Sequence, residues 1–215
     1  MMDNREYILR HRGEDVRALA LRGAEARVKL PGWAGPDGIL FPPRLNMEQC
    51  SSQWAAEYKA RQVERLLPRG RASMADLTGG LGVDFSFLAP LFRTATYVER
   101  DPGLCEAALH NLPLLGAAHA RVECAAAEDF LKATGCHDLI YLDPSRRDGS
   151  GRKVVALRDC SPDVQALAGT LRARARLVMV KLSPMLDISH TLAALPDVRE
   201  VHVVSVEGEC RELLL

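Results

Sequence analysis

Asp76-Leu77-Thr78-Gly79-Gly80-Leu81-Gly82-Val83-Asp84 is the segment that decides the fold, because it joins a short β-like run to a helical run through three glycines. A glycine-rich turn between a strand and a helix lets a ligand approach the backbone closely, and the N–H groups at the helix start can hold a carboxylate or a phosphate. A turn of this kind also occurs for purely structural reasons. We expect this one to bind an anionic group.

The same segment fits a dinucleotide poorly. Gly80-x-Gly82 lacks the third glycine of a G-x-G-x-x-G motif, because Phe85 occupies that place. Asp76, at the end of the strand, would repel a pyrophosphate but could accept a hydrogen bond from an amino group.

Outward from this segment, short β-like runs alternate with amphipathic helical runs, which predicts a parallel, doubly wound α/β sheet. We expect strands at 73–77, 94–99, 120–124, 138–143, 175–182, 200–206 and 210–215, and helices at 83–92, 102–115, 162–174 and 186–195. Ser161 is the expected N-cap of the third helix, with Pro162 as its first residue. Only the short segment VEGE separates Val206 from Cys210, so the last two strands should form an antiparallel hairpin.

The first part of the chain has a different character. Residues 30–46 are rich in glycine and proline, and a longer helix is expected from Ser51 or Ser52 to Leu67. We therefore divide the chain into a helical N-terminal lobe, residues 1–70, and an α/β domain, residues 71–215.

Composition limits the possible functions. The chain has 215 residues, 47% of them apolar, which is enough for one α/β core. No apolar run approaches the about 20 residues of a membrane span, and the N-terminus is charged, so we expect a cytoplasmic protein that does not enter membranes. The six cysteines form no C-x-x-C pair, so we expect reduced thiols and no metal site. The 28 basic and 28 acidic residues balance, which argues against binding nucleic acid by bulk charge alone.

Two further acidic motifs follow the glycine turn. Glu99 closes the next strand about 20 residues on, the position from which a carboxylate reaches ribose hydroxyls, although a surface acid could also stand there. Arg100 follows it and is grouped with the same site. Glu128 or Asp129 could accept from an adenine amino group while Phe130 packs against the ring, but an acid that caps a short helix explains the motif nearly as well.

The motif Asp143-Pro144 indicates the reaction class. A buried apolar strand brings it to the carboxyl end of the sheet, where open α/β sheets bind their ligands. The Asp143 carboxylate and the Pro144 carbonyl could together hold the hydrogens of an amino group, which favours a pyramidal nitrogen aimed at a methyl donor. Alone, the motif would also fit a strand-ending turn.

In this order and spacing, these motifs resemble class I S-adenosylmethionine-dependent methyltransferases, including the D/N-P-P-Y/F group that acts on amino groups of nucleic-acid bases. Members of the class have a seven-stranded sheet whose last strand is antiparallel to the sixth, as the predicted hairpin requires. A closer resemblance, from about residue 45 to the end, is to a bacterial methyltransferase family with a THUMP-like C-terminal domain. The residues that carry it are Glu48-Gln49-Cys50-Ser51-Ser52, Tyr58-Lys59, DLTGGLGVD, YVERD, LDPSRRD, VKLSP and VEGECRELLL.

The resemblance implies S-adenosylmethionine as cofactor and a base in RNA, rRNA or tRNA, as substrate. The expected cofactor-binding residues are Asp76, Thr78, Gly79, Gly80, Gly82, Glu99, Arg100, Glu128 and Asp129; Asp143 and Pro144 are the expected catalytic residues; Ser145, Arg146, Arg147 and Lys181 are the expected substrate residues. Lys181 fits a partly buried structural lysine equally well. Chains of this family continue past the hairpin into the THUMP-like domain, so we expect this sequence to be part of a longer protein whose remainder contributes RNA affinity.

The sequence departs from the amino-methylating group at two places. Ser145 replaces a second proline, and Arg146 replaces an aromatic residue, although an arginine plane can also stack on a base. A D-P-P-R form occurs in enzymes that methylate a pyrimidine carbon, which use a cysteine nucleophile after the next strand. Residues 180–184, VKLSP, contain no cysteine. The alternatives are a methyltransferase for a small molecule or a protein, and a non-catalytic module that binds S-adenosylmethionine or RNA.

Overall fold

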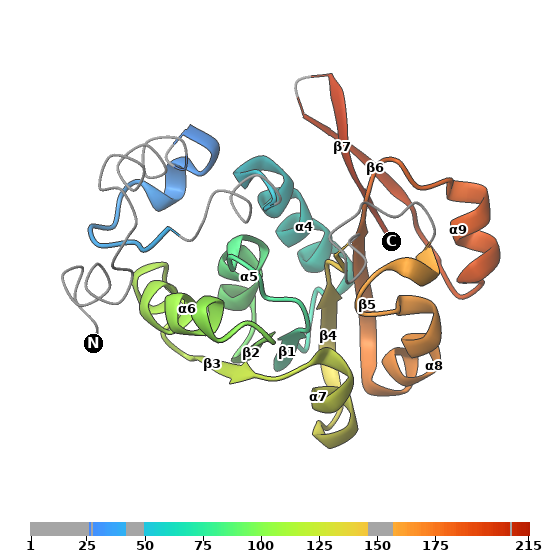
Figure 1. Ribbon diagram of the computed structural model, residues 1–215, viewed down its shortest axis with the longest axis horizontal. Coiled ribbons are helices and arrows are strands. Elements are labelled where there is room, and N and C mark those ends of the chain that lie inside the picture. Colours follow the sequence, from blue (N-terminus) through green and yellow to red (C-terminus); the bar gives the residue numbers. More distant parts are fainter. Residues whose placement is uncertain (1–25, 27, 42–49, 146–156, 207) are drawn as a thin grey trace.

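The computed structural model describes residues 26, 28–41, 50–145, 157–206 and 208–215 (Figure 1). Its centre is a seven-stranded sheet in the order β3-β2-β1-β4-β5-β7-β6. The strands are β1 (Ser73–Asp76), β2 (Thr94–Glu99), β3 (Ala120–Cys124), β4 (His137–Leu142), β5 (Ala175–Leu182), β6 (His202–Val206) and β7 (Glu209–Leu214). These bounds confirm the expected strands to within about two residues.

The sheet is parallel from β3 to β5 and then changes direction. Strand β7 lies between β5 and β6 and is antiparallel to both, with Lys181 paired to Leu214. The predicted hairpin is therefore confirmed. Figure 1 shows its tip projecting away from the body of the sheet.

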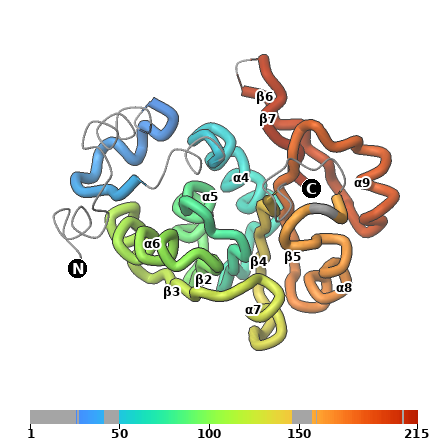
Figure 2. Tube along the Cα trace, in the orientation of Figure 1, coloured from blue at the N-terminus to red at the C-terminus, as the bar shows by residue number. Residues whose placement is uncertain are grey.

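Helices cover both faces of the sheet (Figures 1 and 2). Side chains alternate along a strand, so Leu139 and Tyr141 of β4 pack into one core cluster, whereas Ile140 and Leu142 pack into the other. The first cluster lies under α4 (Gln53–Leu66), α5 (Val83–Leu88) and α6 (Pro102–Leu114), and the second lies under α7 (Ala127–Ala133), α8 (Val164–Arg174) and α9 (Ile188–Ala194). Short 3₁₀ turns occur at Pro31–Trp33, Ala89–Leu91 and Leu157–Asp159.

Helix starts follow the capping residues of the sequence, with one correction. The Ser52 side chain caps α4, as expected. The expected cap of α8 at Ser161 is wrong: Asp163 caps that helix by accepting from the Ala166 N–H at 3.0 Å. Ser161 instead exchanges backbone hydrogen bonds with Ser145, and Pro162 therefore precedes the helix.

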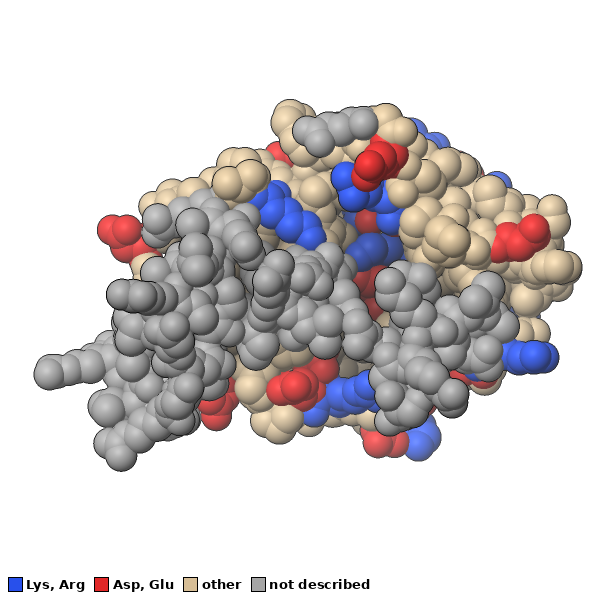
Figure 3. All heavy atoms as spheres, turned by 45° about the horizontal axis from the view of Figure 1, so that its top comes forward, with Lys and Arg blue, Asp and Glu red and all other residues tan. Residues whose placement is uncertain are grey.

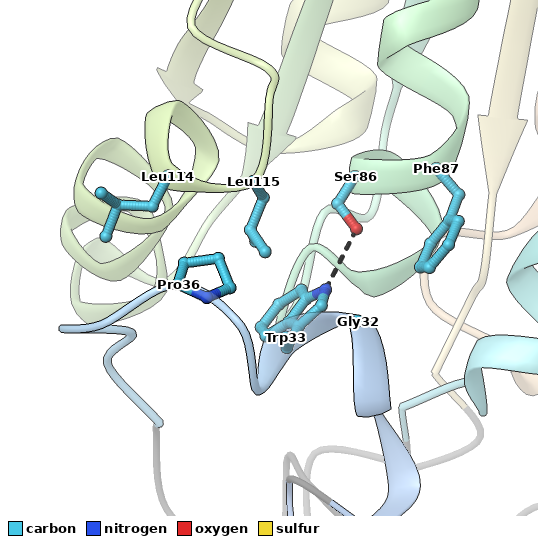
Figure 4. Close-up of a pocket in the computed structure, with 7 residues that line it drawn as sticks. All are labelled: Gly32, Trp33, Pro36, Ser86, Phe87, Leu114 and Leu115. Atoms are coloured by element: carbon cyan, nitrogen blue, oxygen red, sulfur yellow. Dashed lines mark hydrogen bonds between the residues drawn. The ribbon is translucent and has the colours of Figure 1, made fainter.

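The described part of the N-terminal segment packs on α5 and α6. Trp33 Nε1 donates to Ser86 Oγ at 3.3 Å (Figure 4). The Asn111 side chain exchanges two hydrogen bonds of 2.8 Å with the backbone of Leu40. Helix α4 also packs directly on the sheet, through Val63 among others. The domain boundary at residue 70 stays a prediction.

Within the described residues, no helix is both long enough and apolar enough to cross a membrane.

Candidate active site

The glycine turn lies between β1 and α5, where the sequence predicted it. Gly80 and Gly82 have positive φ values of 54° and 84°, a conformation that residues with a side chain rarely adopt. Gly79 has a different reason to be glycine, because a Cβ there would lie 2.2 Å from the Tyr97 ring. The Tyr97 hydroxyl also donates to the Gly80 carbonyl. The ring therefore supports the turn from β2, a contact that the sequence did not predict.

Asp76 ends β1 directly below this turn and is buried. Its Oδ1 accepts from the Thr78 backbone N–H at 2.9 Å. Burial raises the pKa of Asp76 well above its usual value, and the negative charges of Asp84, Asp143 and Glu99 add to the effect, although the bond from Thr78 opposes it. Among the residues that the structure describes, no cation pairs with Asp76. A positively charged ligand group would therefore be attracted to this position.

Glu99 ends β2 beside the turn and holds it in place. Its Oε2 accepts from the Gly80 N–H at 2.9 Å, and its Oε1 accepts from the N–H groups of Arg100 and Asp101 at 2.8 and 2.9 Å. Because Oε2 accepts one bond, it has capacity for a second, such as one from a ribose hydroxyl. Glu99 thus has a structural role, and its binding role stays a prediction.

Asp143 follows β4 and is held from two sides. Its backbone N–H donates to Thr78 Oγ1 at 2.6 Å, which connects it to the glycine turn. Its Oδ2 accepts from Lys181 Nζ at 2.5 Å, which connects it to β5. Pro144 is buried and Ser145 is exposed. The structure therefore brings the predicted acceptor residues and the predicted cofactor turn together at the carboxyl edge of the sheet.

Lys181 stays positively charged at this site. Burial opposes the charge, but the carboxylates of Asp143, Asp84 and Glu212 outweigh burial and raise the pKa of Lys181 above its usual value. A protonated lysine cannot act as a general base. Among the described residues, the ammonium group of Lys181 forms an ion pair with Asp143.

A second set of charged side chains lies deeper on the same face of the sheet, and the sequence analysis missed it. Lys59 Nζ of α4 is 3.1 Å from Asp84 Oδ1 and 2.5 Å from Glu212 Oε1. Ser51 Oγ and the Tyr141 hydroxyl each donate to Asp84 Oδ2 at 2.7 Å. We call Ser51, Lys59, Asp84, Tyr141 and Glu212 the buried charge cluster. The surface view in Figure 3 shows other basic and acidic side chains in a hollow near the centre of one face, whereas Lys59 and Glu212 are buried.

The sequence did carry a signal for this cluster. Lys59 lies three and four residues from Ala56 and Val63, so it occupies the apolar stripe of its own helix. A lysine in such a stripe requires a buried partner. Its partner Glu212 is 153 residues away in the chain, and that pairing could not be read from local pattern.

Other predicted site residues lie further out. Glu128 and Asp129 are exposed in the first turn of α7, and neither caps the helix, because the cap is Ala126. The Phe130 ring packs against His137 at a centroid distance of 6.1 Å, at the opposite end of β4 from Asp143. The expected contact of Phe130 with an adenine ring is therefore not supported by this packing.

Three predicted residues concern the rim of the site. Arg100 is exposed, and its guanidinium donates to Ser161 Oγ at 3.4 Å. Arg146 and Arg147 lie outside the described residues, so their predicted role stays a prediction.

The residues present fit S-adenosylmethionine. Its sulfonium and ammonium groups are cationic, and the turn is surrounded by the carboxylates of Asp76, Glu99 and Asp143. Asp76 is buried, and none of the described cations pairs with it. Its carboxylate therefore suits the ammonium group of the cofactor as a partner. Among the described side chains, no group of three His, Cys, Asp or Glu residues is arranged to hold a metal ion.

A pocket of about 250 Å³ lies elsewhere on the molecule (Figure 4). Its lining residues are Gly32, Trp33, Pro36, Ser86, Phe87, Leu114 and Leu115. None of them belongs to the predicted site, so this pocket has no part in the assignment.

Comparisons with known proteins agree with this geometry. No family model and no curated protein sequence matches the chain. The crystal structure of a "putative methyltransferase" from Porphyromonas gingivalis W83 is 37% identical to it and matches with a TM-score of 0.80. The chain has the class I methyltransferase fold. The match covers 92% of this chain and 48% of that protein, so the chain spans about half the length of this relative.

Two more distant structures show the same fold. A precorrin-6y C5,15-methyltransferase from Geobacter metallireducens GS-15 is 14% identical, with a TM-score of 0.58 over 78% of this chain and 88% of its own. An rRNA methylase from Streptococcus thermophilus is 11% identical, with a TM-score of 0.54 over 73% and 91%. By their descriptions, one acts on a small molecule and the other on RNA. The methyltransferase fold therefore does not by itself select the substrate.

Proposed function

We propose that this chain is the catalytic domain of an S-adenosylmethionine-dependent methyltransferase that modifies an exocyclic amine of a nucleobase in RNA. The observation that carries the proposal is the position of Asp143, which is bonded to Thr78 of the glycine turn and to Lys181 of β5. A single carboxylate thus lies between the cofactor turn and the acceptor side of the site.

The chain's residues would divide the work as follows. Asp76, the glycine turn and Glu99 hold S-adenosylmethionine, which supplies an electrophilic methyl group when bound. Lys181 binds Oδ2 of Asp143, and no described residue binds Oδ1, which would accept a hydrogen from the substrate amine. Thr78 and Lys181 fix the direction of the carboxylate, and such positioning is the main requirement for a transfer that needs little acid–base strength.

Nitrogen is favoured over carbon as the acceptor atom. Methylation of a pyrimidine carbon requires a cysteine thiolate. The fold does bring Cys50 close enough to be affected by the charge of Lys181, but burial raises the pKa of the Cys50 thiol and disfavours the thiolate. RNA is supported by the resemblance of the motifs to enzymes that act on nucleic-acid bases. We further propose that this chain belongs to a longer protein with a THUMP-like domain, as the resemblance of the motifs implies.

The test uses the full-length protein, radiolabelled S-adenosylmethionine and total RNA from cells that lack the gene. Digestion of the product to nucleosides identifies the modified base. Asp143→Ala should lower turnover by about 100-fold or more while cofactor affinity stays within about twofold, because its backbone bond to Thr78 remains. Asp197→Ala, which removes an exposed partner of Arg172, is the control. Label transfer to a small-molecule fraction but not to RNA, or full activity of Asp143→Ala, would refute the proposal.

A further inference from the structure

The buried charge cluster lies beside the acceptor site, and the function proposed above assigns it no role. Lys59 and Glu212 have exposed fractions of 0% and 2%, and Asp84 has 7%. Each is supplied by a different element, since Lys59 belongs to α4, Asp84 to α5 and Glu212 to β7. The cluster therefore connects three elements at the point where they meet the sheet.

Stability is a weak explanation for such a cluster. Removing charges from water is costly, and replacing a buried ion pair by apolar side chains of similar volume is often neutral or even stabilising. Here two carboxylates surround one lysine, so the charges of the three residues do not balance. Burial raises the pKa of Glu212, and the negative charge of Asp84 adds to the effect, although Lys59 opposes it.

A further cation, Lys181, acts on both carboxylates of the cluster. Lys181 pairs with Leu214 in the β5–β7 ladder. Leu214 is two residues from Glu212, so their side chains lie on the same face of β7. Asp84 and Glu212 both contribute to the raised pKa of Lys181, so both carboxylates are close enough to attract its ammonium group. That ammonium group nevertheless lies 2.5 Å from Asp143. Asp84 and Glu212 thus compete with Asp143 for one cation.

We propose that Lys59 is a positioning residue of the acceptor site, which occupies Asp84 and Glu212 so that Lys181 stays on Asp143. The inference deepens the proposed function and rests on it, because it assigns a role to the contact that orients Asp143. Without Lys59, the two buried carboxylates would draw Lys181 inward, since an unpaired buried charge is far more costly than a partly exposed one. Asp143 has a side-chain exposure of 34%, so water can replace its lost partner.

The experiment compares Lys59→Met with Arg65→Met in the full-length protein. Arg65 is on the same helix and pairs with Glu200 beside β6, but that pair is exposed and lies outside the cluster. In Lys59→Met, kcat for RNA methylation should fall by about 10- to 100-fold, with cofactor affinity and KM nearly unchanged, because only the orientation of Asp143 is lost. Arg65→Met should match the wild type. A folded Lys59→Met protein with wild-type kcat, measured below its melting temperature, would overturn the proposal.

A structural readout separates this inference from the proposed function. The crystal structure of Lys59→Met should show Lys181 Nζ moved from Asp143 toward Asp84 or Glu212, whether or not the protein methylates RNA. The triple variant Lys59→Met/Asp84→Asn/Glu212→Gln removes the competing charges, so Lys181 should return to Asp143 and kcat should recover. If Lys59→Met does not fold, Lys59→Met/Glu212→Gln keeps the charge balance, and it should show a smaller displacement and a smaller loss. An unmoved Lys181 in Lys59→Met, or in Lys59→Met/Glu212→Gln where Lys59→Met does not fold, would refute the positioning role.

Discussion

Glu99→Ala is the most informative single change at the cofactor side of the site. It removes one predicted contact to a ribose hydroxyl and three observed bonds, to the N–H groups of Gly80, Arg100 and Asp101. Arg100 and Asp101 are exposed, so water can replace Glu99 at those two groups. The Gly80 bond belongs to the turn that contacts the cofactor. Loss of a hydrogen bond to a charged group costs about 1–3 kcal/mol, so S-adenosylmethionine should bind about 5- to 150-fold more weakly.

Isothermal titration calorimetry with purified protein measures this difference directly. Glu123→Ala is the matched control, because Glu123 lies on the neighbouring strand β3 and pairs with Arg121 at the surface. It should leave the Kd within about twofold. Glu99→Gln keeps the size of the side chain but places an amide N–H against one backbone donor, so an intermediate Kd is expected. Equal Kd values for Glu99→Ala and the wild type would refute the assignment of Glu99 to the cofactor site.

Three further predictions address other parts of the site. The pKa of Asp76 is raised well above its usual value, so binding of a cationic cofactor at a pH below that pKa should release a proton from Asp76. Calorimetry in buffers of different ionisation enthalpy should detect this release in the wild type but not in Asp76→Asn. Gly79→Ala should lose cofactor binding and about 1–3 kcal/mol of unfolding free energy in urea titrations, because its Cβ would overlap the Tyr97 ring. Gly169→Ala is the control, because the space around Gly169 is open, and it should not be destabilised. Replacing Arg146 and Arg147 by Ala in the full-length protein should flatten the salt dependence of RNA binding, by a slope of about 0.7 for each lost phosphate contact. An unchanged slope would count against contact between RNA and these two arginines.

Most of the fold could be predicted because its signals are local. Short β-like runs of five to eight residues located each strand, and the short VEGE segment required the antiparallel hairpin. The start of α8 was misjudged because Ser161-Pro162 and Asp163 are both suitable starting signals in the sequence. Only tertiary pairing of Ser161 with Ser145 decides between them.

The site was predictable where one motif supplies both geometry and chemistry, as in the glycine turn and Asp143. It was not predictable where contacts join distant segments. Tyr97 reaches Gly80 across 17 residues, and Lys59 reaches Glu212 across 153. Periodicity shows which side chains are buried, but it does not show which partner a buried charge will meet.

The acidic floor of the site also restricts how an RNA substrate could enter. Glu99 repels phosphate, and the ammonium group of Lys181 is already paired with Asp143, so the described residues of this floor attract phosphate poorly and the RNA backbone must be held outside it. A base can reach Asp143 only if it leaves its stack and enters alone, as in other enzymes that act on bases. The net charge of zero then does not conflict with an RNA substrate, because we assign the backbone contacts to Arg146, Arg147 and the proposed THUMP-like domain.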